Sequence, residues 1–303
     1  MSTFTPRVDR PTSHVGGVDG AGTLVLIGGA CTPDGHALGA FASEVRRLDG
    51  ALVGITAASS DPVGSAGLWK KDFRSIGLTD VHFPTVGRPA TPDDREAAAR
   101  IDDAAAVFLG GGDQVKLVAT LSGTRTCAAM KRLYARGGVV GGTSAGAAAL
   151  SALTMAGGEV DTEGHLVEQY IGPGFGLLGF EAIIDTHFSQ RRRLQRLFLV
   201  IAGNPQLFGL GLDENTALVV RGMLGEVVGA GGVTFVDGRD SVRFDNAMDV
   251  EQGRQLTLSH LRVGIVGTRY HLDLARRELH ELLTGAASPY VRGASPEEHS
   301  PVR

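Results

Sequence analysis

Short apolar segments alternate with segments of helical periodicity through the first half of the chain. The apolar segments have the length of buried strands and cover residues 23–30, 51–57, 81–86 and 104–109. The segments between them place apolar residues at helical spacing and cover residues 36–48, 93–103 and 117–136. This alternation predicts βαβ units and a mostly parallel sheet, and the near-continuous apolar strands predict that both of its faces are covered.

The last third of the chain has a different pattern. Residues 210–220, 226–236 and 256–274 alternate apolar and polar positions in the manner of antiparallel strands and hairpins. We therefore predict an α/β fold with an open, mostly parallel, doubly wound sheet. The alternating segments would form a C-terminal antiparallel β extension of that same sheet, and no internal repeat is visible in the sequence.

The two ends of the chain differ from the middle in composition. Residues 1–20 and 286–303 are rich in proline, glycine, serine and charged residues. Such segments bury little apolar surface, so we expect both to be poorly ordered. The remaining residues, 21–285, are expected to form one α/β domain, because nothing in the composition forces a split.

Overall composition narrows the class of protein. The chain has 303 residues, of which 43% are hydrophobic and 20% charged, so it can bury a large core. A net charge of -4 and a pI near 6.1 argue against a nucleic-acid partner. We find no apolar stretch of signal-peptide or membrane-helix length and expect a cytoplasmic protein with no membrane partner. The two cysteines, Cys31 and Cys127, are expected to be free thiols and lack metal-site spacing, so no metal is predicted.

Residues 139–149 carry the strongest chemical signal. Apolar residues lead into Gly-x-Ser-x-Gly at 142–146, and an alanine-rich helical stretch follows. The order of strand, sharp turn and helix is typical of a nucleophile elbow, which lifts a serine, here Ser144, into a cleft. A Cβ at either motif glycine would clash, and the turn would aim the Ala145 N–H at a developing oxyanion. The motif also arises by chance in glycine-rich chains, but its position between strand and helix favours the functional interpretation.

Other glycine clusters fall at strand ends, at residues 28–29 and 110–112. In open α/β sheets the ligand site lies at the carboxyl ends of the strands. The Gly112 N–H could therefore face that of Ala145 and complete an oxyanion hole, and Gln114 would reach into the cleft. The alternative for this second cluster is a plain turn between strand and helix.

A serine hydroxyl needs a base, and His187 is the best placed of nine histidines. It follows an apolar strand that we expect to end at the same sheet edge as Ser144. A structural histidine that caps the next helix is the alternative. The orienting acid stays open between Asp185, Asp213 and Glu214; we expect the last two to point to opposite sides of their strand.

A cluster of four arginines follows the histidine closely. Arg191, Arg193 and Arg196 lie in a stretch that we predict to be a basic helix. A solvated helix face is the usual explanation of such a charge run. Because Arg193 and Arg196 share a face and lie near the proposed base, they would also make bidentate clamps for substrate carboxylates.

Four motifs in register resemble the cyanophycinase family of serine peptidases: FLGGGDQ (108–114), GGTSAGA (141–147), DTHFSQRRRLQRL (185–197) and GLGLDENTAL (209–218). Their order and spacing agree with that family from about residue 23 to residue 274. The resemblance implies a class I glutamine amidotransferase-like fold, related to aspartyl dipeptidase. It also implies a homodimer and a reaction that needs no metal or organic cofactor.

The resemblance also assigns roles to residues. It implies Ser144 as nucleophile, His187 as general base and Glu214 as orienting acid. The implied substrate contacts are Gln114, Asp185, Thr186, Arg191, Arg193 and Arg196.

The implied substrate is cyanophycin, a poly-aspartate backbone with arginine on each side-chain carboxyl, and the product is the β-Asp-Arg dipeptide. Family members typically carry glutamine at the position of Thr186. Threonine is shorter and lacks the amide, so a small β-aspartyl or isopeptide substrate is the alternative.

Two other functions are weaker alternatives. An α/β-hydrolase esterase shares the Gly-x-Ser-x-Gly motif, but such enzymes have the chain order serine, acid, histidine, whereas His187 here precedes Glu214. A non-catalytic metabolite binder could use the glycines at 28–29. That segment has neither a Gly-x-Gly-x-x-Gly nor a Walker sequence, so phosphate binding has little support.

Overall fold

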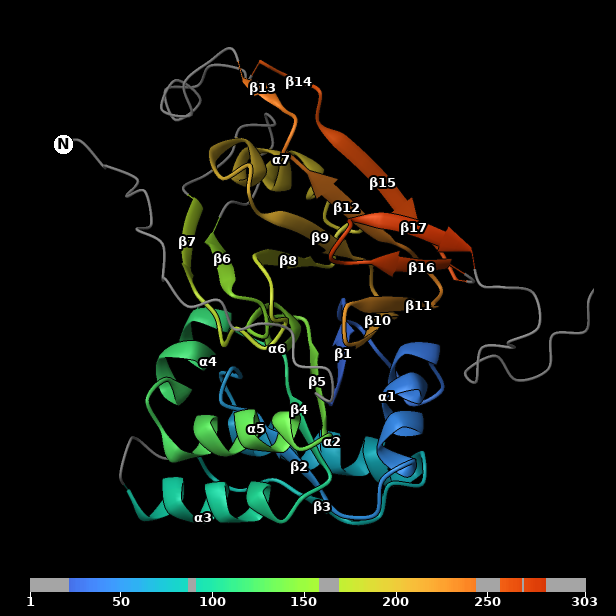
Figure 1. Cartoon of the computed structure of the whole chain (residues 1–303). Coiled ribbons are helices and arrows are strands. Elements are labelled where there is room, and N and C mark those ends of the chain that lie inside the picture. The colour runs from blue at the N-terminus through green and yellow to red at the C-terminus, as the bar shows by residue number, and fades with distance from the viewer. Residues whose placement is uncertain (1–21, 87–90, 158–168, 244–256, 269, 282–303) are drawn as a thin grey trace, which may run out of the picture.

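A computed structural model describes residues 22–86, 91–157, 169–243, 257–268 and 270–281 of the chain (Figure 1). The segments expected to be poorly ordered, 1–20 and 286–303, lie outside the described residues. Within the described part, most strands belong to two sheets, one of nine strands and one of six.

The nine-stranded sheet has a parallel core flanked by an antiparallel half. Its parallel strands are β1 (Thr23–Ile27), β2 (Leu52–Ile55), β3 (Val81–His82), β4 (Ala106–Leu109) and β5 (Val139–Thr143). Antiparallel strands continue the sheet beyond β1, namely β10 (Thr216–Arg221), β11 (Leu224–Gly229), β16 (Tyr270–Asp273) and β17 (Glu278–Glu281). The order across the sheet is β17-β16-β11-β10-β1-β5-β4-β2-β3. The predicted parallel core with an antiparallel extension is confirmed.

The six-stranded sheet corrects one part of the prediction. It comprises β6 (Leu153–Gly157), β7 (Gln169–Pro173), β8 (Ala182–Thr186), β9 (Phe208–Leu212), β12 (Val233–Asp237) and β15 (Arg262–Val266), in the order β15-β12-β9-β8-β6-β7. The C-terminal strands therefore do not all extend the first sheet, because β9, β12 and β15 belong to the second. An alternation of apolar and polar positions indicates that one face of a strand is covered. The alternation is the same whichever sheet the strand joins. A separate short ladder joins β13 (Val242–Arg243) to β14 (Leu258–Ser259).

Helices cover both faces of the parallel core. The apolar side chains of α1 (His36–Arg46) pack on one face together with Phe73 of α2 (Pro62–Ser75). The other face is covered by α3 (Pro92–Asp102), α4 (Gln114–Leu121) and α5 (Arg125–Ala135). The same buried cluster continues into one face of the six-stranded sheet, whose opposite face carries α7 (Leu194–Gly203). One continuous core thus joins the two sheets.

The helix predictions are confirmed except where a turn interrupts the apolar pattern. The helices expected at 36–48 and 93–103 are present, but the one expected at 117–136 is two helices, α4 and α5. Gly123 has φ +75° between them, and the Thr124 side chain accepts the Cys127 N–H and caps α5. The apolar pattern does not predict α2, because its residues Val63 and Leu68 are exposed and only Phe73 is buried.

The turn from β5 into α6 (Ala145–Ala148) is packed too tightly for side chains at its glycines. A Cβ on Gly142 would lie 2.5 Å from the carbonyl carbon of Gly146, and a Cβ on Gly146 would lie 2.2 Å from the Leu109 carbonyl oxygen. Both neighbours are backbone atoms that cannot rotate away. The expected clash at both motif glycines is confirmed.

Replacing Gly146 by alanine tests this packing. We expect Gly146→Ala to lower the free energy of unfolding by about 3 kcal/mol, because the backbone of β4 must move away from the new methyl group. Gly67→Ala is the matched control, since Gly67 is an exposed residue of α2 and a Cβ there would have no atom within 4 Å. There the substitution should raise stability by about 0.5–1 kcal/mol. Urea denaturation of both variants measures the difference, and equal stabilities would contradict the packing argument.

Candidate active site

Ser144 sits on a strained turn at the end of β5. Its φ of 50° and ψ of -118° are rare for a residue with a side chain, and such strain costs about 1–3 kcal/mol. Its N–H donates to the Ile27 carbonyl at 2.9 Å, which ties the turn to the end of β1. Gly111 lies against it, since a Cβ there would be 3.4 Å from the Ser144 Cβ. The side chain lines a cavity of about 370 Å³.

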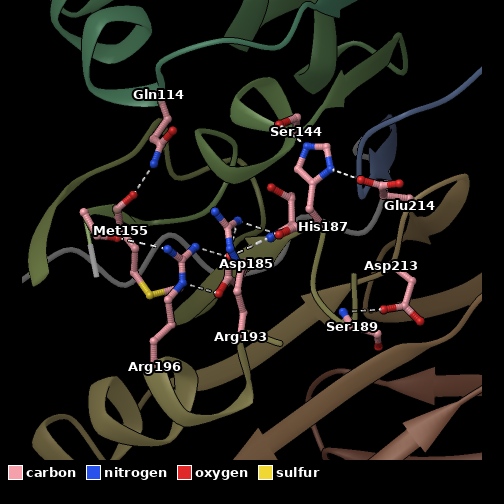
Figure 2. A network of polar contacts seen from close by, with 12 residues as sticks. Gln114, Ser144, Met155, Asp185, His187, Ser189, Arg193, Arg196, Asp213 and Glu214 are labelled. Carbon is pink, nitrogen blue, oxygen red and sulfur yellow. Dashed lines mark hydrogen bonds and ion pairs between the residues drawn. The ribbon is translucent and has the colours of Figure 1, made fainter. Parts of the chain in front are cut away.

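His187 and Glu214 complete a hydrogen-bonded series with Ser144 (Figure 2). The His187 Nε2 lies 2.9 Å from the Ser144 Oγ, and its Nδ1 lies 2.6 Å from the Glu214 Oε1. The histidine side chain is 13% exposed and the glutamate side chain 34%. We call these three residues the Ser-His-Glu series. A neutral imidazole bonded in this way has Nδ1–H aimed at the carboxylate and Nε2 free to accept the serine proton.

The series is drawn from both sheets, which corrects the expectation that Ser144 and His187 share one sheet edge. Ser144 follows β5 of the nine-stranded sheet, whereas His187 follows β8 of the six-stranded sheet. Glu214 lies in the turn where the chain passes from β9 in the second sheet to β10 in the first. The site therefore forms where the two sheets meet. The expectation is wrong because apolar strand patterns do not say which sheet a strand joins.

Of the three candidate acids, Glu214 is the one that contacts the imidazole. Asp213 points away and accepts the N–H groups of Ser189 and Gly232, each at 3.0 Å. The expected divergence of Asp213 and Glu214 is thus present in the structure. The third candidate, Asp185, is 2% exposed and is bonded to arginine side chains.

The residues expected at the oxyanion hole lie beside the serine. Gly112 lines the cavity next to Ser144 with φ +138°, and a Cβ there would lie 2.2 Å from the Ala58 carbonyl oxygen. Among the described residues, no acceptor takes the Gly112 N–H. Ala145 is the first residue of α6, so its N–H has no partner inside the helix. The N–H groups of Gly112 and Ala145 therefore have no acceptor among the described residues.

The residues that the family resemblance links to substrate all lie in the cavity wall: Gln114, Asp185, Thr186, Arg191, Arg193 and Arg196. Several of them are engaged with the protein itself. Gln114 donates its side-chain amide to the Met155 carbonyl. Thr186 is 5% exposed, and its N–H donates to Asp185 Oδ1 at 2.9 Å.

Asp185 and the neighbouring arginines form a buried ionic cluster (Figure 2). Arg196 is 5% exposed, donates Nε to Asp185 Oδ2 at 2.7 Å, and also donates Nη2 to Asp185 Oδ1. Its Nη1 donates to the Gly157 carbonyl at 2.9 Å. Arg193 donates to Asp185 Oδ1 at 3.2 Å and to the Thr186 carbonyl at 2.6 Å. The sequence analysis did not identify the Met155 and Gly157 carbonyls of β6 as hydrogen-bond acceptors in this wall. A backbone acceptor does not depend on the residue type, so the sequence carries no sign of it.

Arg191 differs from this cluster. It is exposed in the cavity wall, and among the described residues its guanidinium has no hydrogen bond or ion pair. The basic helix expected from this residue onward is wrong, because α7 begins only at Leu194. Arg192 has φ 52° and the preceding residues form turns, which end the helical pattern on its N-terminal side.

Other chemistry has less support in the described part of the chain. Its His, Cys, Asp and Glu side chains form no group of three or more placed to hold a metal ion. Cys31 donates to the Thr143 hydroxyl beside the serine turn, and burial raises the pKa of its thiol, which disfavours the nucleophilic thiolate. No helix in these ranges combines the length and the apolar character that a bilayer crossing requires.

A serine at a strand–turn–helix junction, bonded to an imidazole that is bonded to a carboxylate, is the arrangement of serine hydrolases. Comparison with known proteins makes the class more specific: this is a serine peptidase, cyanophycinase-like in sequence. The chain belongs to peptidase family S51, whose family model matches residues 73–228.

Relatives cover most of the chain. It is 33% identical over 258 residues to a cyanophycinase from Synechococcus elongatus, and the match spans 83% of this chain and 79% of that protein. A cyanophycinase from Geminocystis herdmanii (strain PCC 6308) is 30% identical over 239 residues, with 78% and 86% covered.

Solved structures support the fold. A peptidase from an acI-B1 Actinobacterium aligns with a TM-score of 0.57 at 21% identity and covers 72% of this chain and 91% of that one. A putative peptidase E from Listeria monocytogenes EGD-e aligns with a TM-score of 0.50 at 19% identity, with 69% and 99% covered. These likenesses agree with the open α/β architecture described above.

The buried cluster gives a stability prediction. Arg196→Met should lower the free energy of unfolding by about 3 kcal/mol, because it removes two donors from a carboxylate that is out of contact with water. Arg191→Met, the same replacement at the exposed guanidinium, should change stability by no more than about 0.5 kcal/mol. Thermal and urea unfolding measure both variants. An Arg196→Met protein as stable as Arg191→Met would show that the buried pair contributes nothing.

Proposed function

We propose that this protein is a cyanophycinase-like serine peptidase that hydrolyses cyanophycin and releases β-Asp-Arg. The observation that carries the proposal is the Ser-His-Glu series, with donor–acceptor distances of 2.9 and 2.6 Å. The similarity of this chain to cyanophycinases over most of its length supports the choice of substrate. Release of an intact β-Asp-Arg unit requires hydrolysis of the backbone amide between consecutive aspartates, which is an acyl transfer to water.

In the proposed mechanism, the Ser144 Oγ attacks the scissile carbonyl carbon while His187 Nε2 takes the hydroxyl proton. The Glu214 carboxylate accepts the hydrogen bond from Nδ1, holds the tautomer and stabilises the imidazolium as it forms. The N–H groups of Gly112 and Ala145 would bind the oxyanion of the tetrahedral intermediate. His187 then gives its proton to the leaving amine, and the C–N bond breaks. Water, deprotonated by the same imidazole, cleaves the acyl-enzyme and restores the serine.

The cavity wall suits the charge pattern of the proposed substrate. Arginine linked through its α-amine to an aspartate side chain keeps a free carboxylate and a guanidinium. The open guanidinium of Arg191 would bind such a carboxylate bidentately. The substrate contacts proposed for Gln114, Asp185, Thr186, Arg193 and Arg196 rest on their position in the same wall. A homodimer is proposed on the family resemblance and can be read from the mass of the protein in solution.

An isoaspartyl or aspartyl dipeptidase that acts on small β-aspartyl or isopeptide substrates is the second candidate. Thr186 favours it, because a short and nearly buried side chain stands in the cavity wall where the resemblance leads us to expect glutamine. Without an amide group at this position, the protein would bind a polymer less tightly, and the binding of a dipeptide would change less.

Removal of the nucleophile tests the class of reaction. Ser144→Ala should fold normally and reduce kcat/KM by about 10⁴- to 10⁶-fold, because the remaining groups cannot form an acyl-enzyme. Ser122→Ala, at an exposed serine just after α4, is the matched control and should retain full activity. Hydrolysis is measured with purified wild-type and variant proteins. Full turnover by Ser144→Ala would remove the proposed mechanism.

A substrate comparison tests the choice between polymer and dipeptide. The protein is incubated in parallel with purified cyanophycin and with simple β-aspartyl dipeptides, and the products are identified by mass spectrometry. We expect β-Asp-Arg from cyanophycin, because the relatives over most of the chain are cyanophycinases. Cleavage of the dipeptides alone would instead favour the second candidate, and the Thr186→Gln variant would then be tested for gain of activity on the polymer.

A further inference from the structure

Three consecutive carbonyl groups at the end of β1, those of residues 27–29, accept backbone N–H groups from three distant segments. Each of these segments carries one member of the Ser-His-Glu series. The bonds run from Ser144 to Ile27 (2.9 Å), from His187 to Gly28 (2.7 Å) and from Asn215, which follows Glu214, to Gly29 (2.8 Å). Residues 27–29 thus lie at the centre of the site without contributing a side chain to it.

The three donor residues share a positive φ. Ser144, His187 and Asn215 have φ values of 50°, 50° and 48°. Residues with a side chain avoid this region, because the Cβ crowds the backbone there. A conformation that is unfavourable on its own persists where surrounding contacts hold it. The carbonyls of residues 27–29 supply such a contact for each of the three.

Gly29 has a second role that its backbone alone does not explain. A Cβ at this position would lie 2.3 Å from Cε1 and 2.4 Å from Nε2 of His187. Nε2 is the atom bonded to the Ser144 Oγ. The imidazole therefore occupies the space that a side chain at Gly29 would fill, and a methyl group there would push the ring off the serine.

We propose that residues 27–29 are the positioning element of the site, with Gly29 as the residue that makes room for the imidazole. This inference rests on the proposed function, because it assigns a role in the same reaction. The glycines at 28–29 would then have a structural role in the site, instead of the phosphate binding considered for them above. The element holds three chain segments from two sheets at one point, so a shift within it moves the base relative to the nucleophile.

Gly29→Ala is the direct test. We expect kcat to fall at least about 100-fold with KM changed less than about threefold, since a misplaced base impairs chemistry rather than binding. The ¹H and ¹⁵N signals of the His187 ring should also shift, because its bonds to Ser144 and Glu214 change. Gly137→Ala is the matched control. Gly137 has φ +97°, close to the +106° of Gly29, but no atom lies within 4 Å of its Cβ position.

The control separates a general backbone penalty from displacement of the imidazole. Both variants should lose stability, and only Gly29→Ala should lose kcat and move the His187 signals. Wild-type kcat in Gly29→Ala, or an equal loss in Gly137→Ala, would overturn the positioning role. Those results would leave the proposed function intact, whereas full activity in Ser144→Ala would refute the function itself.

A second pair of variants covers the case in which Gly29→Ala fails to fold. Asn215→Ala keeps the N–H that donates to Gly29 but disfavours the left-handed backbone, and we expect kcat to fall at least about tenfold. His260→Ala is its control, because His260 has a similar φ of 59° at an exposed turn. Equal kcat values for these two variants would overturn the proposal.

Discussion

The hydrogen bond from the His187 N–H to the Gly28 carbonyl, 2.7 Å long, joins the two sheets at the site. β1, which ends just before Gly28, is central in the nine-stranded sheet, whereas His187 is the first residue after β8 in the six-stranded sheet. If the two sheets moved apart by even about 1 Å, the imidazole would be out of reach of the serine. Backbone bonds suit this task, because they do not depend on side-chain rotamers.

A cluster of buried charges fixes a neighbouring part of the same region. Asp185 lies two residues before His187, with its side chain 1% exposed, and such a carboxylate would be costly without donors. Arg196 and Arg193 supply those donors. Arg196 also donates to the Gly157 carbonyl, and Arg193 donates to the Thr186 carbonyl. The cluster therefore fixes the end of β8 to α7 and β6. It also leaves Arg191, among the described arginines of this wall, as the guanidinium that is open to a ligand.

The parts of the fold that depend on local pattern could be predicted from the sequence. Gly142, Ser144 and Gly146 specify a strand, a turn and a helix within a few residues, and the packing there agrees with the pattern. The partition of strands between two sheets was not predictable, because it depends on pairing between distant segments. The break at Gly123 and Thr124 has a local signal in its turn and cap residues, but the apolar spacing continues across it and favours one long helix.

The candidate acids show where prediction from sequence stops. Local geometry predicts that the side chains of Asp213 and Glu214 diverge, but it does not say which of them faces the histidine. That choice depends on the passage of the chain from β9 to β10. Asp213 directly follows β9 of the second sheet, and its side chain accepts the N–H groups of Ser189 and Gly232.

Glu214, one residue later, has already turned toward the first sheet and meets the imidazole. The two consecutive carboxylates therefore have different roles: Asp213 fixes the turn, and the fixed turn aims Glu214. A replacement at Asp213 would act on the histidine only through the backbone. Of two consecutive carboxylates, only the one that the turn aims at the imidazole contacts it.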